Sequence, residues 1–258
     1  MNSPLAVANT NDTPGSVRQI KIKTLFTKSP DTSGWLRVRL EPSGESAYLC
    51  EYVKVAVSKQ DDRTHFVIME GQHKKKTASL KMENAAKCLV DGKRGGGAKI
   101  VAKTIGRQML ISKPRKNEAK NQLVATLSFD GHTAMITLDS DVKYRETNPL
   151  SPDVGKILQS KPLPMGTYKI MTPEIPKSAS MTAFYIDAPG GYPELKDHTV
   201  WFPIEYAPTH NSNFVHVGNL SEGCVTMYEL KMWNPLYAYL ISNRSDSEGK
   251  YVGTVTIE

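Results

Sequence analysis

The chain has 258 residues, of which 39 % are apolar and 23 % are charged, and its 33 Lys and Arg against 26 Asp and Glu give a net charge of +7. No apolar run approaches the ~18 residues of a membrane-spanning helix, so we expect no membrane insertion. The positive charge favours an anionic partner, for which a cell-wall polymer, a lipid surface and a nucleic acid are candidates, or it serves solubility alone.

The first residues differ in composition from the rest of the chain. Residues 1–18 are rich in Asn, Thr, Pro, Ser and Gly and show no apolar periodicity, so we expect a flexible lead. Neither a basic n-region nor a continuous apolar h-region is visible there, so the sequence shows no secretory signal peptide.

Short runs of alternating apolar and polar residues then predict half-buried strands. The runs lie at residues 20–23, 35–40, 53–57, 98–102 and 108–111. The polar stretch Ser112–Asn121 has the composition of a linker. We therefore predict a β-rich N-terminal domain of unknown role at residues 19–118 and a second domain at residues 119–258.

The second domain is predicted to be mainly β with a few short helices. Strands at 123–129 and 133–138 flank Asp130-Gly131, a strong hairpin signal. Further strands are expected at 162–170, 181–186, 200–204 and 254–258, and a helical segment at 228–233. Asn234 and Pro235 indicate a new helix, with Asn as the N-cap.

The segment Phe214–Met227 holds the strongest candidate for chemistry. His216 lies eight residues before Cys224, and an imidazole beside a thiol can take its proton and produce the nucleophilic thiolate. Gly223 suits a tight turn that presents the thiol. Taken singly, each residue has a plainer reading, since an isolated Cys is most often a small buried apolar side chain and an isolated His between valines a strand residue.

Three cysteines, Cys50, Cys88 and Cys224, are present without CxxC or His/Cys ligand spacing, so we predict no metal site and no cofactor. Cys50 and Cys88 could pair with each other, or both remain buried thiols. Because His216 is expected to lower the pKa of Cys224, we predict that Cys224 reacts fastest with an electrophile.

Two segments resemble the L,D-transpeptidase (YkuD-type) catalytic domain. Ser221–Val225 is similar to the Ser-x-Gly-Cys-(Ile/Val) stretch that follows a His-Gly stretch in that family, and Pro162–Ile170 is similar to its Pro-x-Gly-x-(Tyr/Phe)-x-Ile strand. The resemblance covers roughly residues 120–258. It implies an L,D-transpeptidase-like β-sandwich or sheet, with Cys224 as nucleophile and His216 as base, oriented by a backbone carbonyl.

The resemblance also suggests the residues around the nucleophile, in two roles. Oxyanion or substrate-binding roles fall to Gly223, Ser221, Gly218, Asn219 and Thr226, and His210 is the reserve base. Two positions depart from the common pattern: Glu222 stands where His is frequent, and Thr226 where an Arg follows the Cys. The substrate-carboxylate or oxyanion contact of that arginine is then missing, and we expect an altered specificity.

The function implied is a peptidoglycan stem-peptide acyltransferase or hydrolase of the L,D-transpeptidase or L,D-carboxypeptidase type. The compact His-to-Cys spacing resembles divergent relatives that include antibacterial toxins injected into rival bacteria. We therefore expect synthesis in the bacterial cytosol and action in the periplasm, either that of the producing cell or that of a target cell. A secretion carrier and an immunity protein are the expected partners. The alternative is that a native leader is missing from the chain.

Two other functions compete with this one. The first is a catalytically inactive module that binds the cell wall or another anionic polymer. The second is nucleic-acid binding, for which basic residues should alternate with exposed aromatic ones. The basic run Lys74–Lys76 has only Phe66 near it. We therefore expect no nucleic-acid partner.

Overall fold

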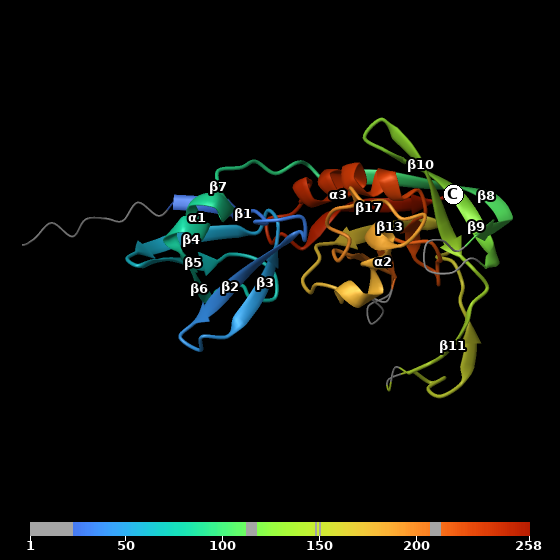
Figure 1. Cartoon of the computed structure of the whole chain (residues 1–258), viewed down its shortest axis with the longest axis horizontal. Helices are drawn as coiled ribbons and strands as arrows, with labels where there is room; N and C mark the ends of the chain where they lie inside the picture. The colour runs from blue at the N-terminus through green and yellow to red at the C-terminus, as the bar shows by residue number, and fades with distance from the viewer. Residues whose placement is uncertain (1–22, 112–117, 148, 150, 207–212) are drawn as a thin grey trace, which may run out of the picture.

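The computed structural model describes residues 23–258 except 112–117, 148, 150 and 207–212. The expected flexible lead lies outside these described residues. The strands form a seven-stranded sheet and a closed eight-stranded barrel, which lie next to each other along the long axis of the molecule (Figure 1). The prediction of a mainly β chain with a few short helices is confirmed, although the second unit is a barrel where a sandwich or sheet was expected.

The N-terminal sheet contains seven strands in the order β3-β2-β6-β5-β4-β1-β7. Their bounds are β1 Lys23–Thr27, β2 Trp35–Glu41, β3 Ser46–Cys50, β4 Lys54–Gln60, β5 Arg63–Ile68, β6 Thr77–Lys81 and β7 Leu89–Val90, with helix α1 at Met82–Cys88. Alternation decides which face is buried: along β5 the side chains of Thr64, Phe66 and Ile68 are buried, while those between them are half-buried.

The barrel closes in the order β10-β16-β15-β14-β13-β17-β8-β9. Its strands are β8 Ala98–Ile111, β9 Ala119–Phe129, β10 His132–Asp139, β13 Gly166–Met171, β14 Phe202–Glu205, β15 Phe214–Val217, β16 Val225–Met227 and β17 Tyr251–Ile257. The predicted β9–β10 hairpin is present, with Asp130 and Gly131 both at positive φ. A small hairpin of β11 Lys143–Arg145 and β12 Ile157–Gln159 projects from the barrel (Figure 1).

The break between the two sheets differs from the predicted domain boundary. The boundary at 118/119 falls between β8 and β9, which pair along most of their length from Val101↔Ser128 to Ile111↔Ala119. The polar stretch that follows Ile111 therefore connects the two strands of a hairpin and not two domains. The chain passes from β7 of the first sheet to β8 of the barrel within residues 91–97.

Two local predictions in the second unit were wrong. Residues 181–186 form no strand, because the chain coils through a 3-10 turn at Ala179–Met181 into helix α2 at Phe184–Asp187. Short apolar runs do not distinguish a strand from a buried helical turn. The 3-10 turn η2 at Leu230–Met232 leads directly into helix α3, Trp233–Ser242. Asn234 is therefore inside the helix, where its side chain binds the backbone of Glu194 and Lys196.

Buried contacts join the sheet to the barrel. The Trp35 indole N–H of β2 donates to the Thr199 hydroxyl at 3.2 Å. The carboxylate of Glu70 lies with the guanidinium groups of Arg94 and Arg244, and both Glu70 and Arg244 are buried. Such a pair is costly to break, because a lone buried charge would remain. The apolar core runs through both units as one cluster.

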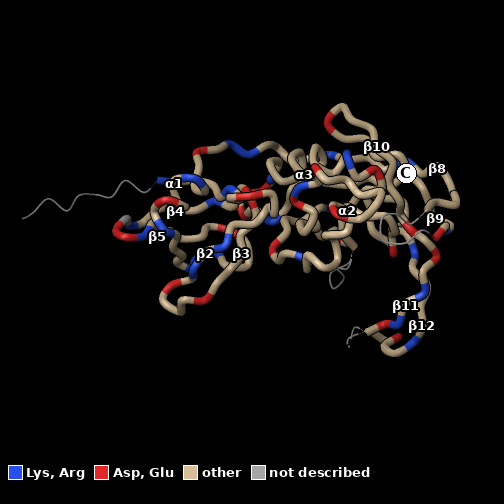
Figure 2. The backbone as a smooth tube through the Cα atoms, viewed as in Figure 1, with Lys and Arg blue, Asp and Glu red and all other residues tan. Residues whose placement is uncertain are grey.

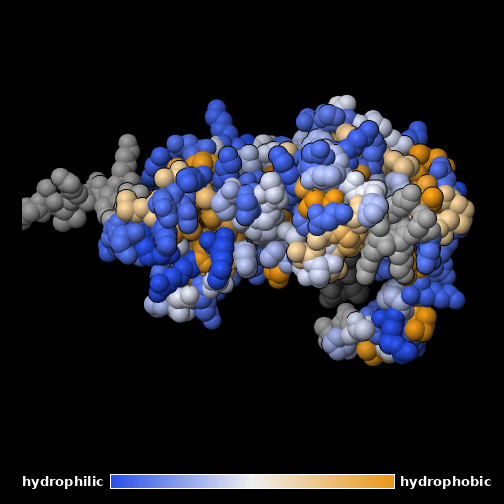
Figure 3. Space-filling model, viewed as in Figure 1, coloured by the Kyte–Doolittle hydropathy of each residue, from blue (hydrophilic) through white to orange (hydrophobic). Residues whose placement is uncertain are grey.

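Figure 2 shows that basic and acidic positions alternate along the backbone of both units. The face seen in Figure 3 is mostly hydrophilic over the N-terminal sheet, and apolar surface gathers towards the β8–β9 end of the barrel. That end carries the exposed side chains of Ile105, Met109 and Ile111.

Candidate active site

Two short parallel strands of the barrel place the predicted catalytic pair. β15 and β16 pair in the register Val215↔Val225, His216↔Thr226 and Val217↔Met227. Paired residues of neighbouring strands point to the same face, and side chains two residues apart on one strand share a face. His216 and Thr226 therefore lie on one face. Cys224 directly precedes β16, and the Phe214 backbone hydrogen-bonds to its thiol.

Both ring nitrogens of His216 have a partner. Nδ1 lies 2.8 Å from the carbonyl oxygen of Val217, which can only accept, so Nδ1 carries the proton. Nε2 is then the acceptor, and the Thr226 hydroxyl donates to it at 3.2 Å. Burial lowers the pKa of His216 to about 4, against the opposing effect of the Val217 carbonyl. The imidazole is therefore neutral at pH 7, with its basic nitrogen towards Thr226.

An aromatic side chain covers the imidazole. The Trp201 ring stacks on His216 with centroids 4.1 Å apart and an interplanar angle of 21°. Trp201 also meets Phe214 edge-on, with centroids 5.7 Å apart. The Lys177 ammonium lies 4.1 Å from the centre of the Phe214 ring and 5.4 Å from that of Trp201. These rings exclude water from His216 and place a cation close to the candidate pair.

Cys224 is a buried thiol, with 9 % of its surface exposed. Burial raises its pKa to about 11, and the Glu222 charge adds to this, while the Phe214 backbone and Lys177 act in the opposite direction. The expectation that His216 lowers this pKa was wrong, because the imidazole is neutral and burial dominates. Among the described contacts no hydrogen bond joins Cys224 Sγ to His216, whose Nε2 is occupied by Thr226.

The loop between the two strands, residues 218–224, returns the chain from the end of β15 to the start of β16. Parallel neighbours usually need a longer crossover, and seven residues suffice here because the strands have only three or four residues. Side chains hold the loop through its carbonyls. Gln122 donates to Asn219 at 3.1 Å, Ser140 to Ser221, Asn213 to Gly223 at 2.7 Å, and Ser221 to Cys224 at 2.7 Å.

Three of the predicted site residues fix the course of this loop. The Asn219 side-chain oxygen accepts from the Tyr185 hydroxyl at 2.9 Å. A side chain at Gly218 would come within 2.8 Å of the Thr226 methyl group. Gly223 has φ +99°, and a Cβ there would lie 2.5 Å from the Lys161 carbonyl oxygen. Both glycines are required by the tight course of the chain around Cys224.

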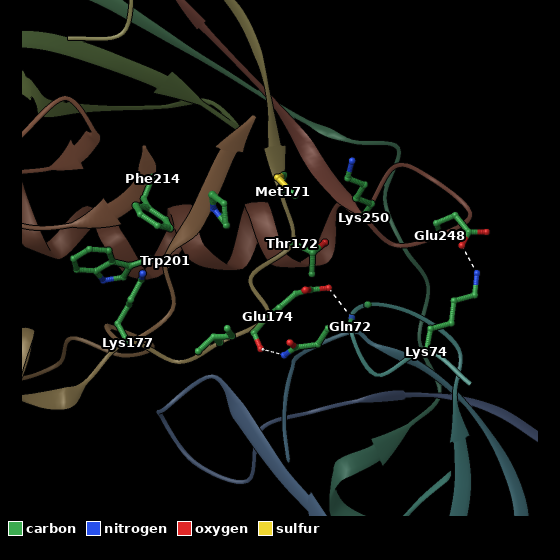
Figure 4. Close-up of a pocket in the computed structure, with 13 residues that line it drawn as sticks. Gln72, Lys74, Met171, Thr172, Glu174, Lys177, Trp201, Phe214, Glu248 and Lys250 are labelled. Atoms are coloured by element: carbon green, nitrogen blue, oxygen red, sulfur yellow. Dashed lines mark hydrogen bonds and ion pairs between the residues drawn. The ribbon is translucent and has the colours of Figure 1, made fainter. Parts of the chain in front are cut away.

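A groove of about 580 Å³ opens beside this site, at the junction of the sheet and the barrel (Figure 4). Phe214, Trp201 and Lys177 form one end of it, and the β5–β6 loop of the N-terminal sheet, with Gln72 and Lys74, lines the opposite part. Cys224 does not line this groove, but Phe214 does, and the Phe214 backbone hydrogen-bonds to the Cys224 thiol.

Sequence reasoning missed several of these residues. Lys177 stands alone in a Pro-rich loop without a motif, and Trp201 lies in the strand predicted at 200–204, to which no site role was given. The contribution of the N-terminal sheet had no sequence signal, because contacts between distant segments leave no local pattern. The reserve base His210 lies outside the described residues. Within the described ranges no group of three or more His, Cys, Asp or Glu forms a potential metal site.

All three cysteines are free and buried, so Cys50 and Cys88 do not pair. None of the helices in the described ranges is long and apolar enough to cross a membrane. Comparisons of the chain with protein-family models, with curated proteins and with solved structures each found no match.

Proposed function

We propose that the chain is a cysteine-dependent acyltransferase or peptidase acting on peptidoglycan stem peptides. The observation that carries the proposal is that Cys224 directly precedes β16, two residues before Thr226, and that the Thr226 hydroxyl contacts the basic Nε2 of His216 on the neighbouring parallel strand β15. The substrate class comes from the resemblance of Ser221–Val225 and Pro162–Ile170 to the L,D-transpeptidase catalytic domain, whose members act on an amide next to a D-configured or meso-diamino residue.

In this mechanism both groups of the resting pair are neutral. His216 Nε2 releases the Thr226 hydroxyl and takes the Cys224 proton as Sγ attacks the amide carbonyl carbon. A C–S bond forms, the carbonyl oxygen gains the electron pair, and the tetrahedral intermediate collapses as the C–N bond breaks. The imidazolium returns its proton to the leaving amine. At rest the proton stays on Cys224, because both groups of the pair are neutral. The Cys224 thiolate therefore forms only in the complex with the substrate, as the C–S bond forms.

The developing oxyanion would bind to the backbone N–H groups of Cys224 and Gly223. One such donor contributes about 3 kcal/mol to transition-state stabilisation. The Asn213 contact holds the Gly223 carbonyl and so fixes the peptide group that carries the Cys224 N–H, while the Ser140 contact holds the Ser221 carbonyl earlier in the same loop. An amine acceptor for the resulting thioester gives transpeptidation, and water gives carboxypeptidase or endopeptidase activity.

Incubation with purified muropeptides tests the proposal directly. Wild-type protein, Cys224→Ala and the matched control Cys88→Ala are compared, since Cys88 is also a buried thiol but lies in helix α1 of the other unit. Mass analysis separates hydrolysis products from exchange products. We expect products from wild type and Cys88→Ala and none from Cys224→Ala; equal product from all three would refute the role of Cys224.

One observation favours a second candidate function, an inactive module that binds an anionic polymer. The pKa of Cys224 is raised, that of His216 is lowered, and no hydrogen bond links them, so the pair is not activated at rest. This alternative predicts saturable binding to isolated cell walls that weakens with salt, survives Cys224→Ala and occurs without any change in muropeptide mass.

We further propose that the protein acts on the cell wall of a target bacterium as an antibacterial effector, with a secretion carrier and an immunity protein as partners. Peptidoglycan lies outside the cytoplasm, so an enzyme of this class is harmful only where it meets the wall. Expression in a susceptible bacterium with and without an added periplasmic signal tests this: lysis or misshapen cells should require both the signal and Cys224. Equal toxicity from the cytosolic form would contradict the wall as target.

A further inference from the structure

The groove beside the candidate pair contains five charged side chains, four of which are already engaged. Lys74 pairs with Glu248, and Lys250 pairs with Glu205 at 3.1 Å. The Glu174 carboxylate accepts the backbone N–H of Gln72 at 2.8 Å. The fifth is Lys177, whose ammonium has no ion pair or hydrogen bond with any residue that the structure describes. It is therefore the cation available to a ligand.

The surroundings of Lys177 fix where that cation lies. Its backbone N–H donates to the Thr199 carbonyl at 2.9 Å, and the Thr199 hydroxyl in turn accepts the Trp35 indole N–H. The N-terminal sheet thus braces the loop that carries Lys177. The side chain points towards the Trp201 ring in Figure 4 and lies over Phe214, the residue whose backbone hydrogen-bonds to the Cys224 thiol. Burial lowers the pKa of Lys177, and the neighbouring Cys224 opposes this.

We propose that Lys177 binds a carboxylate of the acyl donor beside Cys224 and so determines the substrate specificity of this site. The inference rests on the proposed function and deepens it. Thr226 offers no positive charge where the L,D-transpeptidase pattern has arginine, and Lys177 supplies one from another loop. An ammonium between two ring faces is partly shielded from water, which strengthens its attraction for a carboxylate. The apolar rings would pack on the carbon atoms next to that carboxylate.

A pair of alkylating reagents of equal size tests the placement of this charge without any peptide. Iodoacetate and iodoacetamide react alike, as Sγ forms a bond to the CH₂ carbon and iodide leaves, but only iodoacetate carries a carboxylate. We take the rate of iodoacetate divided by that of iodoacetamide at Cys224 and divide it by the same ratio for glutathione. Because both reagents attack the same thiolate, a change in the thiol pKa does not alter this ratio. The variants are Lys177→Met and Lys177→Arg. The control is Lys169→Met, because Lys169 also lies over an aromatic ring, 4.6 Å from the Tyr251 centroid, but outside the groove.

We expect Lys177→Met to lower the iodoacetate preference about fivefold, with Lys177→Arg and Lys169→Met within about twofold of wild type. The preference of wild type should also weaken as salt is raised. An unchanged ratio in Lys177→Met, an equal fall in Lys169→Met, or a Cys224 that neither reagent reaches would each overturn the proposal. The ratio is measured by mass mapping of all three cysteines.

Stem tetrapeptides amidated at one carboxylate at a time then identify the group that Lys177 binds. Against wild type, Lys177→Met should raise KM for the free peptide about tenfold and leave KM unchanged for one amidated peptide. Equal losses on all peptides would overturn carboxylate recognition. A shifted alkylation ratio without any turnover of peptides would instead refute the proposed function and leave the carboxylate site in place.

Discussion

The raised pKa of Cys224 gives a direct expectation for thiol reactivity. Because the thiolate fraction rises with pH until the pKa of about 11, alkylation by iodoacetamide should accelerate about tenfold per pH unit from pH 7 to 10. Cys224 should still react before Cys50 and Cys88, since 9 % of its surface is exposed against 2 % and 1 %. Mass mapping after brief pulses measures this. A plateau below pH 8, or faster labelling of Cys88, would contradict it.

The base is the second residue that mutation can test. His216→Ala should lower turnover by about 10²- to 10⁴-fold, the usual contribution of a general base. His210→Ala should lower it only slightly, because His216 already offers a neutral imidazole whose Nε2 contacts Thr226, two residues after Cys224. Steady-state kinetics on muropeptides compares the two variants with wild type. A dead His210→Ala protein beside a nearly normal His216→Ala protein would reverse the roles.

At the scale of elements, the loop between β15 and β16 depends on Gly223. Its φ of +99° and the 2.5 Å approach of a Cβ to the Lys161 carbonyl oxygen predict that Gly223→Ala loses about 2 kcal/mol or more of unfolding free energy, together with activity. Gly155→Ala is the matched control, because Gly155 has φ +84° but open space around its Cβ position. Urea unfolding of both variants separates steric overlap from backbone strain. Equal losses would show that strain alone matters.

The elements also show what local patterns can reveal. The alternation of apolar and polar residues around the Asp130-Gly131 turn was sufficient to predict the β9–β10 hairpin. The two-residue spacing of Val255 and Ile257 was sufficient to predict β17. Both patterns depend only on residues close together in the sequence. Residues 181–186 were misread because tertiary contacts decided their form: Tyr185 turns inwards to bind Asn219. The parallel pairing that joins His216 to Thr226 depends on barrel closure, which no local pattern records.

The site could be predicted only in part, for the same reason. The types and spacing of His216 and Cys224 were visible in one segment. The direction of their pKa shifts could not be predicted, because the side chains that bury them, such as Trp201 and the barrel core, come from segments far apart in the chain. Lys177 had no signal at all, since its importance lies in having no charge partner within a groove that the N-terminal sheet completes.

For the whole molecule, Asp197 makes stability depend on pH. It lies at the junction of the two units, where its backbone N–H donates to Thr32 at 2.7 Å. Burial, with a contribution from Glu51, raises its pKa to about 7. The folded state therefore favours the protonated carboxyl, and the stability that it contributes below pH ~4 is lost as the pH rises through about 7.

Asp197→Asn keeps a side chain that tolerates the positive φ of 53° and cannot ionise. It should match wild type near pH 4 and exceed its unfolding free energy by about 2 kcal/mol at pH 8, a figure reduced for partial exposure. Thermal or urea unfolding at both pH values measures the difference, with the exposed Asp91→Asn as control. A constant difference across this range would show that Asp197 does not ionise in the folded protein.

The central claim is that Cys224 carries the acyl group, and an intact-protein mass spectrum tests it most directly. Wild-type protein is mixed briefly with a stem tetrapeptide and quenched in acid, beside Cys224→Ser and Cys88→Ser. We predict an added mass equal to the peptide less its leaving amine on wild type and Cys88→Ser, mapped to Cys224, and none on Cys224→Ser. Muropeptide turnover without any adduct, undiminished in Cys224→Ser, would contradict the account.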